Sequence, residues 1–202
     1  MLHGLDGRRI LVAVLRDDRS TQEKAEALRS ALERAEAEVE VRKADSGADD
    51  EWRGGIYAGL VTVGGDDEGA NPHPRLVQLV REFLASEKPV AAIGGAVAAI
   101  VQAGGAAGRT LAAGRKLKDA VESAGGRWVD APVHSDGCLI SARPDTDAAA
   151  FAIDVVREFA GALDEREVDT MSEQSFPASD PPSTTPGSVG HVAPDRDTGA
   201  QP

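Results

Sequence analysis

The sequence predicts an α/β fold: a three-layer sandwich of the flavodoxin-like type, with a mostly parallel sheet between helices and an antiparallel hairpin at one side. Short apolar runs rich in β-branched residues alternate with longer segments of helical periodicity. The apolar runs are continuous, as expected for parallel strands that are buried on both faces. A turn signal at residues 135–137, Ser-Asp-Gly, separates two strand-like segments near the C-terminal end of this pattern and predicts the hairpin.

Each expected element has its own pattern. We expect strands at residues 9–15, 39–41, 56–63, 89–93, 109–113, 128–134 and 138–142. We expect helices at residues 20–35, 76–84, 96–102 and 116–124, and a last one that follows residue 145 and ends near residue 163. Ser20 and Glu23 form a capping box for the first helix, and Asp145 is the expected cap of the last.

Composition divides the chain into two parts. Residues 1–164 form the predicted α/β domain, whereas residues 165–202 are rich in Pro, Ser, Thr, Asp and Gly and carry seven acidic and two basic residues. Such a segment buries too little apolar surface to offset the entropy cost of ordering, so we expect it to be disordered. Its one apolar island, residues 175–182, is a candidate motif for binding an unknown protein; the alternative is an ordinary disordered tail.

Charge and apolar content exclude several classes of partner. The net charge of −12 repels phosphate backbones and anionic membranes, so neither nucleic acid nor membrane is an expected partner. No apolar run approaches the roughly 20 residues of a membrane-spanning helix. Residues 1–9 lack the apolar stretch of a signal peptide, so we expect a cytoplasmic location. The single cysteine, Cys138, forms no intramolecular disulfide and no multi-cysteine metal site.

Several motifs, in this order along the chain, resemble the ThiJ/PfpI family of the class I glutamine amidotransferase-like superfamily. The strand ending in Gly64-Gly65 is similar to the family's strand with a Gly-Gly turn, and residues 87–93 resemble the strand that leads into its nucleophile elbow. Further similar segments are residues 103–110, 118–119, 124–125, 128–130 and 136–143. The resemblance covers residues 8–163. It implies the same fold, a homodimer and a role in stress response.

The expected elbow departs from the family pattern. Where the family usually reads Ala-Ile-Cys-His-Gly, residues 92–96 of this chain read Ala-Ile-Gly-Gly-Ala. Glycine carries no nucleophile, so thiol chemistry is lost at Gly94. The glutamate that the family places beside its thiol aligns near Thr21, and Cys138 lies far from the elbow in sequence. The chain is therefore expected to be a pseudoenzyme that binds a small molecule or a protein.

The elbow also predicts a ligand site. In relatives, backbone N–H groups around the Gly-Gly turn and the elbow bind the developing oxyanion, and a helix that begins there adds its positive end. The candidate binding residues are Gly64, Gly65, Gly94 and Gly95. We expect a small anionic or polar ligand and no cofactor.

Polar residues expected at the same edge of the sheet form a candidate rim. These are Asp17, Asp18, Asp67 and His73. They have no fixed ligand spacing, so no metal is assigned; a hard cation held by oxygens and a solvated acidic rim remain the two alternatives. The alternative function is an intracellular hydrolase, amidase or carbonyl-processing lyase that uses carboxylates of this rim with a bound water.

Overall fold

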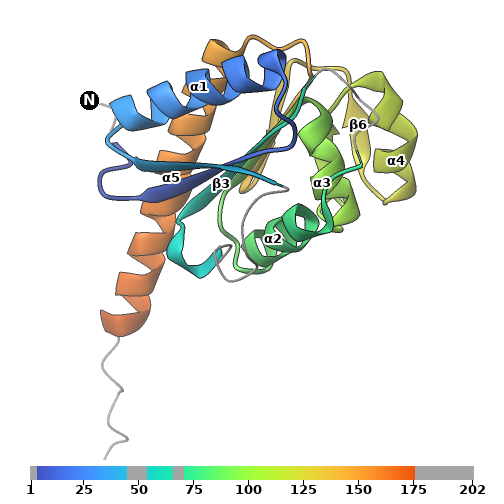
Figure 1. Ribbon diagram of the computed structural model, residues 1–202. Coiled ribbons are helices and arrows are strands. Elements are labelled where there is room, and N and C mark those ends of the chain that lie inside the picture. Colours follow the sequence, from blue (N-terminus) through green and yellow to red (C-terminus); the bar gives the residue numbers. More distant parts are fainter. Residues whose placement is uncertain (1–3, 45–53, 66–70, 176–202) are drawn as a thin grey trace, which may run out of the picture.

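A six-stranded sheet forms the centre of the molecule in the computed structural model, which describes residues 4–44, 54–65 and 71–175, with side chains to residue 166 (Figure 1). Its strands lie in the order β2 (Glu38–Lys43), β1 (Arg9–Val14), β3 (Gly59–Val63), β4 (Val90–Ile93), β8 (Leu139–Ala142) and β7 (Val133–Asp136). The first five are parallel, and β7 is antiparallel to β8. This is the flavodoxin-like strand order with an added hairpin strand, so the predicted fold class is confirmed.

Helices cover both faces of the sheet, as the three-layer prediction requires. In Figure 1, α1 (Arg19–Arg34) and α5 (Ala148–Ser175) lie on one side, and α2 (Pro74–Ala85) and α3 (Val97–Gln102) lie on the other. Alternate residues of β1 enter the two cores: Ile10 and Val12 pack in the cluster of α1 and α5, whereas Leu11 packs in the cluster of α2 and α3. The sheet is therefore buried on both faces, which explains the continuous apolar runs in the sequence.

A second, two-stranded parallel sheet lies beside the main one. It consists of β5 (Thr110–Ala112) and β6 (Arg127–Val129), joined through the 3-10 helix η4 (Arg115–Leu117) and α4 (Lys118–Ser123). The single strand expected over residues 128–134 is therefore wrong: its first two residues end β6, and its last two begin β7. The break falls at Pro132, which has no N–H to donate to a strand ladder.

The ends of two helices differ from the prediction. Asp18, not Ser20, caps α1, because its Oδ1 accepts a hydrogen bond from the Thr21 amide at 2.9 Å. Asp147, not Asp145, accepts from the Ala150 amide at 2.8 Å in the first turn of α5. In both cases the capping carboxylate belongs to the residue directly before the helix, where it can reach the exposed amides of the first turn.

The expected boundary at residue 164 falls inside a helix. α5 continues to Ser175, so the start of the segment expected to be disordered is helical. Residues 176–202, with nearly all of the apolar island at 175–182, lie outside the described part of the chain. Among the described helices, none combines the length and apolar content needed to cross a bilayer.

Candidate functional site

The turn after β4 is the elbow of this fold, and glycine backbone fills it. Gly94 opens the 3-10 helix η3 (Gly94–Ala96), which joins β4 to α3, and its φ of +70° lies in the left-handed region that favours glycine. A Cβ atom at Gly94 would lie 2.6 Å from the carbonyl oxygen of Gly64 and 2.7 Å from that of Gly65. Real Cβ atoms do not approach backbone this closely, so this arrangement accommodates only glycine.

The backbones of the two Gly-Gly turns are bonded to each other. The Gly95 amide donates to the Gly65 carbonyl at 3.1 Å, and the Gly64 amide donates to the Ile93 carbonyl at 3.0 Å. All four glycines at this junction are buried. We expected open N–H groups at Gly64, Gly65 and Gly95; the amides of Gly64 and Gly95 are bonded to backbone carbonyls instead. The Gly64–Ile93 bond continues the pairing of β3 with β4. The Gly95–Gly65 bond joins the two turns, an approach that a Cβ at Gly94 would block.

Asp18 and Thr21 lie against this junction. A Cβ at Gly65 would lie 3.1 Å from Asp18 Oδ2 and 3.2 Å from Thr21 Oγ1. The Thr21 hydroxyl donates to Asp18 Oδ2 at 2.8 Å, and the Thr21 side chain is fully buried. The hydrogen bond from the Thr21 amide lowers the pKa of Asp18 below its usual value. Asp18 is thus an ionised helix cap beside the elbow.

Asp17 and His73, two further residues of the expected rim, each contact residues near them. Asp17 forms an ion pair with Lys43 of β2 and accepts from Gln22, and chiefly the bond from Lys43 lowers the Asp17 pKa. His73 precedes α2, and its Nδ1 accepts from the Arg75 amide at 3.3 Å. Asp67 lies outside the described residues. Within the described ranges, no three His, Cys, Asp or Glu side chains gather as a metal site would require.

Cys138 lies at the opposite edge of the sheet from the elbow. Its carbonyl accepts from the amide of Val90, the first residue of β4, at 2.8 Å. Gly94 follows the last residue of the same strand, so β4 separates the two by about 13 Å at the usual rise per residue. The only thiol of the chain therefore does not reach the elbow.

A depression opens at the carboxyl edge of the sheet, one strand along from the elbow, with a volume of about 670 Å³. Because Ala142 of β8 pairs in register with Ile93 of β4, Arg143 and Gly94 follow neighbouring strands at this edge. We call it the Arg143 depression. The residues that carry its chemistry are Lys24, Arg115, Asp130, Arg143, Pro144 and Asp145.

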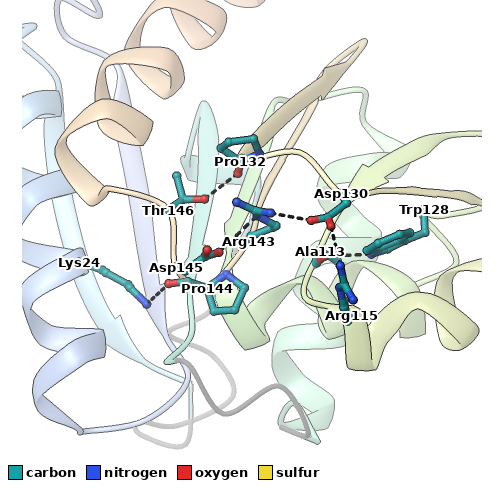
Figure 2. Close-up of polar contacts among 10 residues, drawn as sticks. All are labelled: Lys24, Ala113, Arg115, Trp128, Asp130, Pro132, Arg143, Pro144, Asp145 and Thr146. Carbon is teal, nitrogen blue, oxygen red and sulfur yellow. Dashed lines mark hydrogen bonds and ion pairs between the residues drawn. The ribbon is translucent and has the colours of Figure 1, made fainter.

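Figure 2 shows two arginines converging on one carboxylate in this depression. Arg143 Nη1 donates to Asp130 Oδ1 at 2.5 Å, and Arg115 Nη2 donates to Asp130 Oδ2 at 3.4 Å. The bond with Arg143 is the main cause that lowers the pKa of Asp130 and raises the pKa of Arg143, so both groups are charged at neutral pH. Arg143 Nε also lies 3.3 Å from Asp145 Oδ1, as an ion pair without hydrogen-bond geometry.

The walls of the Arg143 depression are held in place by further bonds. Lys24, on α1, is only 7% exposed, and its Nζ donates to the Pro144 carbonyl at 2.8 Å. The Thr146 hydroxyl donates to the Pro132 carbonyl at 2.7 Å (Figure 2). These bonds connect α1, the segment after β6 and the segment after β8. The site is therefore assembled from parts of the chain that are distant in sequence.

Sequence reasoning did not single out the Arg143 depression. The available signal is the position of Arg143: it follows β8, and residues just after the parallel strands of one sheet gather at one edge. Asp130 follows β6 of the second sheet, so this rule does not place it beside Arg143. Lys24 has no such signal, because a lysine in an amphipathic helix is typical of a solvated face. Its burial appears only in the folded structure.

The fold and its elbow define a class, the flavodoxin-like α/β domains with a sharp strand-to-helix turn at the carboxyl edge. Within that class the family is clear. The sequence model of the DJ-1/PfpI family matches residues 43–158, more than half of the chain, and the chain belongs to this family. This confirms the family membership that the resemblance to ThiJ/PfpI proteins predicted.

Known proteins of similar sequence and structure agree with this assignment. A curated relative, an uncharacterized protein of Archaeoglobus fulgidus, is 33% identical over 102 residues, which are 50% of this chain and 61% of the relative. The matched part thus spans less than two thirds of that relative. Among solved structures, Drosophila melanogaster DJ-1beta has a TM-score of 0.62 at 22% identity, with 82% of this chain and 98% of that chain covered.

Two bacterial structures show the same fold. The ThiJ/PfpI domain protein of Brachyspira murdochii has a TM-score of 0.61 at 19% identity and covers 79% of this chain and 98% of its own. A mutant of a DJ-1 superfamily protein from Salmonella typhimurium has a TM-score of 0.64 at 20% identity, with coverages of 81% and 98%. At these identities the likeness concerns the fold alone.

Proposed function

We propose that this chain is a non-catalytic DJ-1/PfpI domain that binds a small anionic or polar ligand and performs no thiol chemistry. The observation that carries the proposal is Gly94. It stands at the strand-to-helix turn where the resemblance aligns the family's cysteine, and it has neither a nucleophile nor room for a Cβ. Family membership supplies the scaffold, and the closed glycine junction supports a role other than catalysis at the elbow.

The surroundings of Gly94 support the same proposal. Asp18, which lies beside Gly65 of the junction, is occupied with capping α1 and with the Thr21 hydroxyl. A general base needs a pKa near the working pH and access to the proton it removes. Asp18 has a lowered pKa and faces its own helix, so it suits a structural role better than an acid–base role.

The rival function is a hydrolase or lyase that activates water with Asp17, Asp18 or Asp67. The test is to incubate the full chain with amides, peptides and glyoxal-type carbonyls and to follow product formation by proton NMR. We expect no turnover above the protein-free control.

Four variants make this result decisive: Asp17→Asn, Asp18→Asn, Asp67→Asn and Cys138→Ser, each checked for folding by circular dichroism. Turnover by the wild type that disappears in a folded carboxylate variant would contradict the proposal and establish the rival function. Turnover that disappears only in Cys138→Ser would also contradict it, because it would place thiol chemistry at the opposite edge of the sheet.

A further inference from the structure

We propose that the Arg143 depression binds a small carboxylate that carries an alcohol or ammonium group on the adjacent carbon, that is, an α-hydroxy or α-amino acid. This inference rests on the proposed function, because it names the ligand class and the place of binding. It moves the site from the closed Gly94 junction to the open depression one strand along.

The arginines supply the recognition of a carboxylate. A guanidinium has five N–H donors in a planar fork that matches the two oxygens of a carboxylate. The contacts of Arg143 with Asp130 and Asp145 use part of this set, and its buried Nε makes no hydrogen bond to any described residue. Arg115 is 84% exposed and holds Asp130 only by a 3.4 Å bond. A ligand carboxylate would give both guanidinium groups acceptors that the protein itself does not provide.

The charge of the Arg143 depression favours an anionic ligand, although the protein as a whole is acidic. Its lining includes the basic side chains of Lys24, Arg115 and Arg143 and the carboxylates of Asp130 and Asp145, a local excess of positive charge in a chain of net charge −12. Such a local reversal of sign draws small anions to one place on a surface that otherwise repels them.

The acceptors of the same depression can bind donors on the ligand. Asp130 and Asp145 each have lone pairs beyond those used by the arginines, since an ionised carboxylate offers about four acceptor positions. The Pro144 carbonyl, which accepts from Lys24, has a second lone pair. A plain carboxylate offers these acceptors no donor and leaves them to water. An alcohol or ammonium group beside the carboxylate matches them.

Size and rigidity fit a small molecule. The volume of about 670 Å³ lies within the range of roughly 300–1,000 Å³ that is typical of small-ligand pockets. The buried Lys24 ties α1 to the segment that bears Arg143, and the Asp130 bridge ties that segment to the end of β6. These bonds position the charged groups before a ligand arrives.

The experiment is a calorimetric titration of the full chain with five probes of similar size. Glycerate and serine carry both a carboxylate and a neighbouring donor; propionate has only the carboxylate, glycerol only the donors, and inorganic phosphate is a different anion. We expect glycerate or serine to bind at least about tenfold more tightly than propionate and phosphate, and glycerol not to bind. Equal binding of propionate or phosphate would overturn the ligand class, and no binding of glycerate and serine would overturn the site.

Variants locate the binding. Arg143→Gln and Arg115→Gln should each weaken binding about tenfold or more, since each removes charge-assisted hydrogen bonds. The matched control is Arg157→Gln on α5, which removes the same charge from an exposed arginine paired with Asp154 and should leave binding unchanged. If Arg143→Gln does not fold, binding to the Arg115→Gln variant, whose side chain is exposed, is measured instead. Binding that is unaffected by the loss of either depression arginine, or reduced equally by the control, would overturn the assignment.

The outcomes separate this inference from the proposed function. If the protein binds glycerate or serine and also converts it, the depression stands and the non-catalytic proposal fails. If neither probe binds and no substrate is turned over, the depression fails as the ligand site while the non-catalytic proposal stands.

Discussion

Replacing Gly94 by alanine is the sharpest test of the closed junction. The variant places a Cβ 2.6 Å from the Gly64 carbonyl oxygen and 2.7 Å from that of Gly65, at a φ of +70°. The left-handed conformation costs a residue with a Cβ about 1–2 kcal/mol. Displacing packed backbone adds about 1–3 kcal/mol, the range for overpacked sites. We therefore expect the free energy of unfolding to fall by about 2–5 kcal/mol.

Gly108 provides a matched control for this variant. Its φ is +71°, almost that of Gly94, but a Cβ there would meet no atom within 4 Å. Gly108→Ala therefore has only the conformational cost, about 1–2 kcal/mol. The difference between the two variants isolates the contact with the carbonyl groups of the Gly64–Gly65 turn.

The assay is urea unfolding followed by circular dichroism for the wild type and both variants under identical conditions. Gly94→Ala should be less stable than Gly108→Ala by about 1–3 kcal/mol. Equal losses in the two variants would show that the turns do not close on Gly94, and the explanation for the sealed elbow would be refuted.

Three further predictions concern the pH response and the polar contacts of the fold. Burial, and then the bond from the Tyr57 hydroxyl to Glu40 at 2.6 Å, raise the pKa of Tyr57 to about 12. Absorbance titration of this sole tyrosine should therefore show a midpoint near that value, and the midpoint should be lower in Glu40→Gln. Because the unfolded chain ionises first, near pH 10.0, the contribution of Tyr57 to stability is present below that pH and is lost as the pH rises through the folded value. Asp18→Ala should lower the free energy of unfolding by about 0.5–2 kcal/mol at neutral pH, because the α1 cap is lost. The difference in stability from the wild type should shrink in acid, as the pH falls from the ordinary carboxyl pKa of 3.8 through the lowered pKa of Asp18 in the folded protein. Ser141→Ala removes the buried hydroxyl that accepts from the Ala112 amide at 2.9 Å, and should cost about 1–3 kcal/mol and speed hydrogen exchange of that amide.

Each of these predictions has a contradicting result. A Tyr57 midpoint near 10 would show that the ring is neither buried nor bonded to Glu40. A stability difference for Asp18→Ala that persists unchanged into strong acid would mean that the ionised carboxylate is not what caps α1. The exposed Ser123→Ala is the control for Ser141→Ala, and equal exchange rates at Ala112 in both variants would contradict the bond between the two sheets.

The sheet could be predicted because its signals are local. The continuous apolar run over residues 9–15 matches β1. The hairpin predicted from the Ser-Asp-Gly signal is present as β7 and β8, although Ser135 and Asp136 belong to β7 and the turn falls at residues 137–138. The division of residues 128–134 was missed because only tertiary packing shows that Trp128 belongs to a second sheet. Its Nε1 donates to the Ala113 carbonyl at 2.9 Å, which fixes the end of β6 against β5 (Figure 2).

The site was harder to predict than the fold. The glycine at the elbow is visible in the sequence. Whether the backbone amides around it are free or hydrogen-bonded depends on how closely the turn after β3 approaches the turn after β4. That approach leaves the amides of Gly64 and Gly95 bonded to backbone carbonyls. The Arg143 depression joins Lys24 to residues more than a hundred positions later, and no local pattern encodes a contact of that kind.

The absence of catalysis at the elbow is the central claim, and one measurement addresses it most directly. The wild type and Cys138→Ser are each incubated with a glyoxal-type carbonyl and with an amide, while proton NMR follows the substrate and intact-mass spectrometry follows the protein. Both proteins should leave the substrates unchanged relative to buffer. Consumption of either substrate in proportion to protein concentration, retained in Cys138→Ser, would contradict the claim.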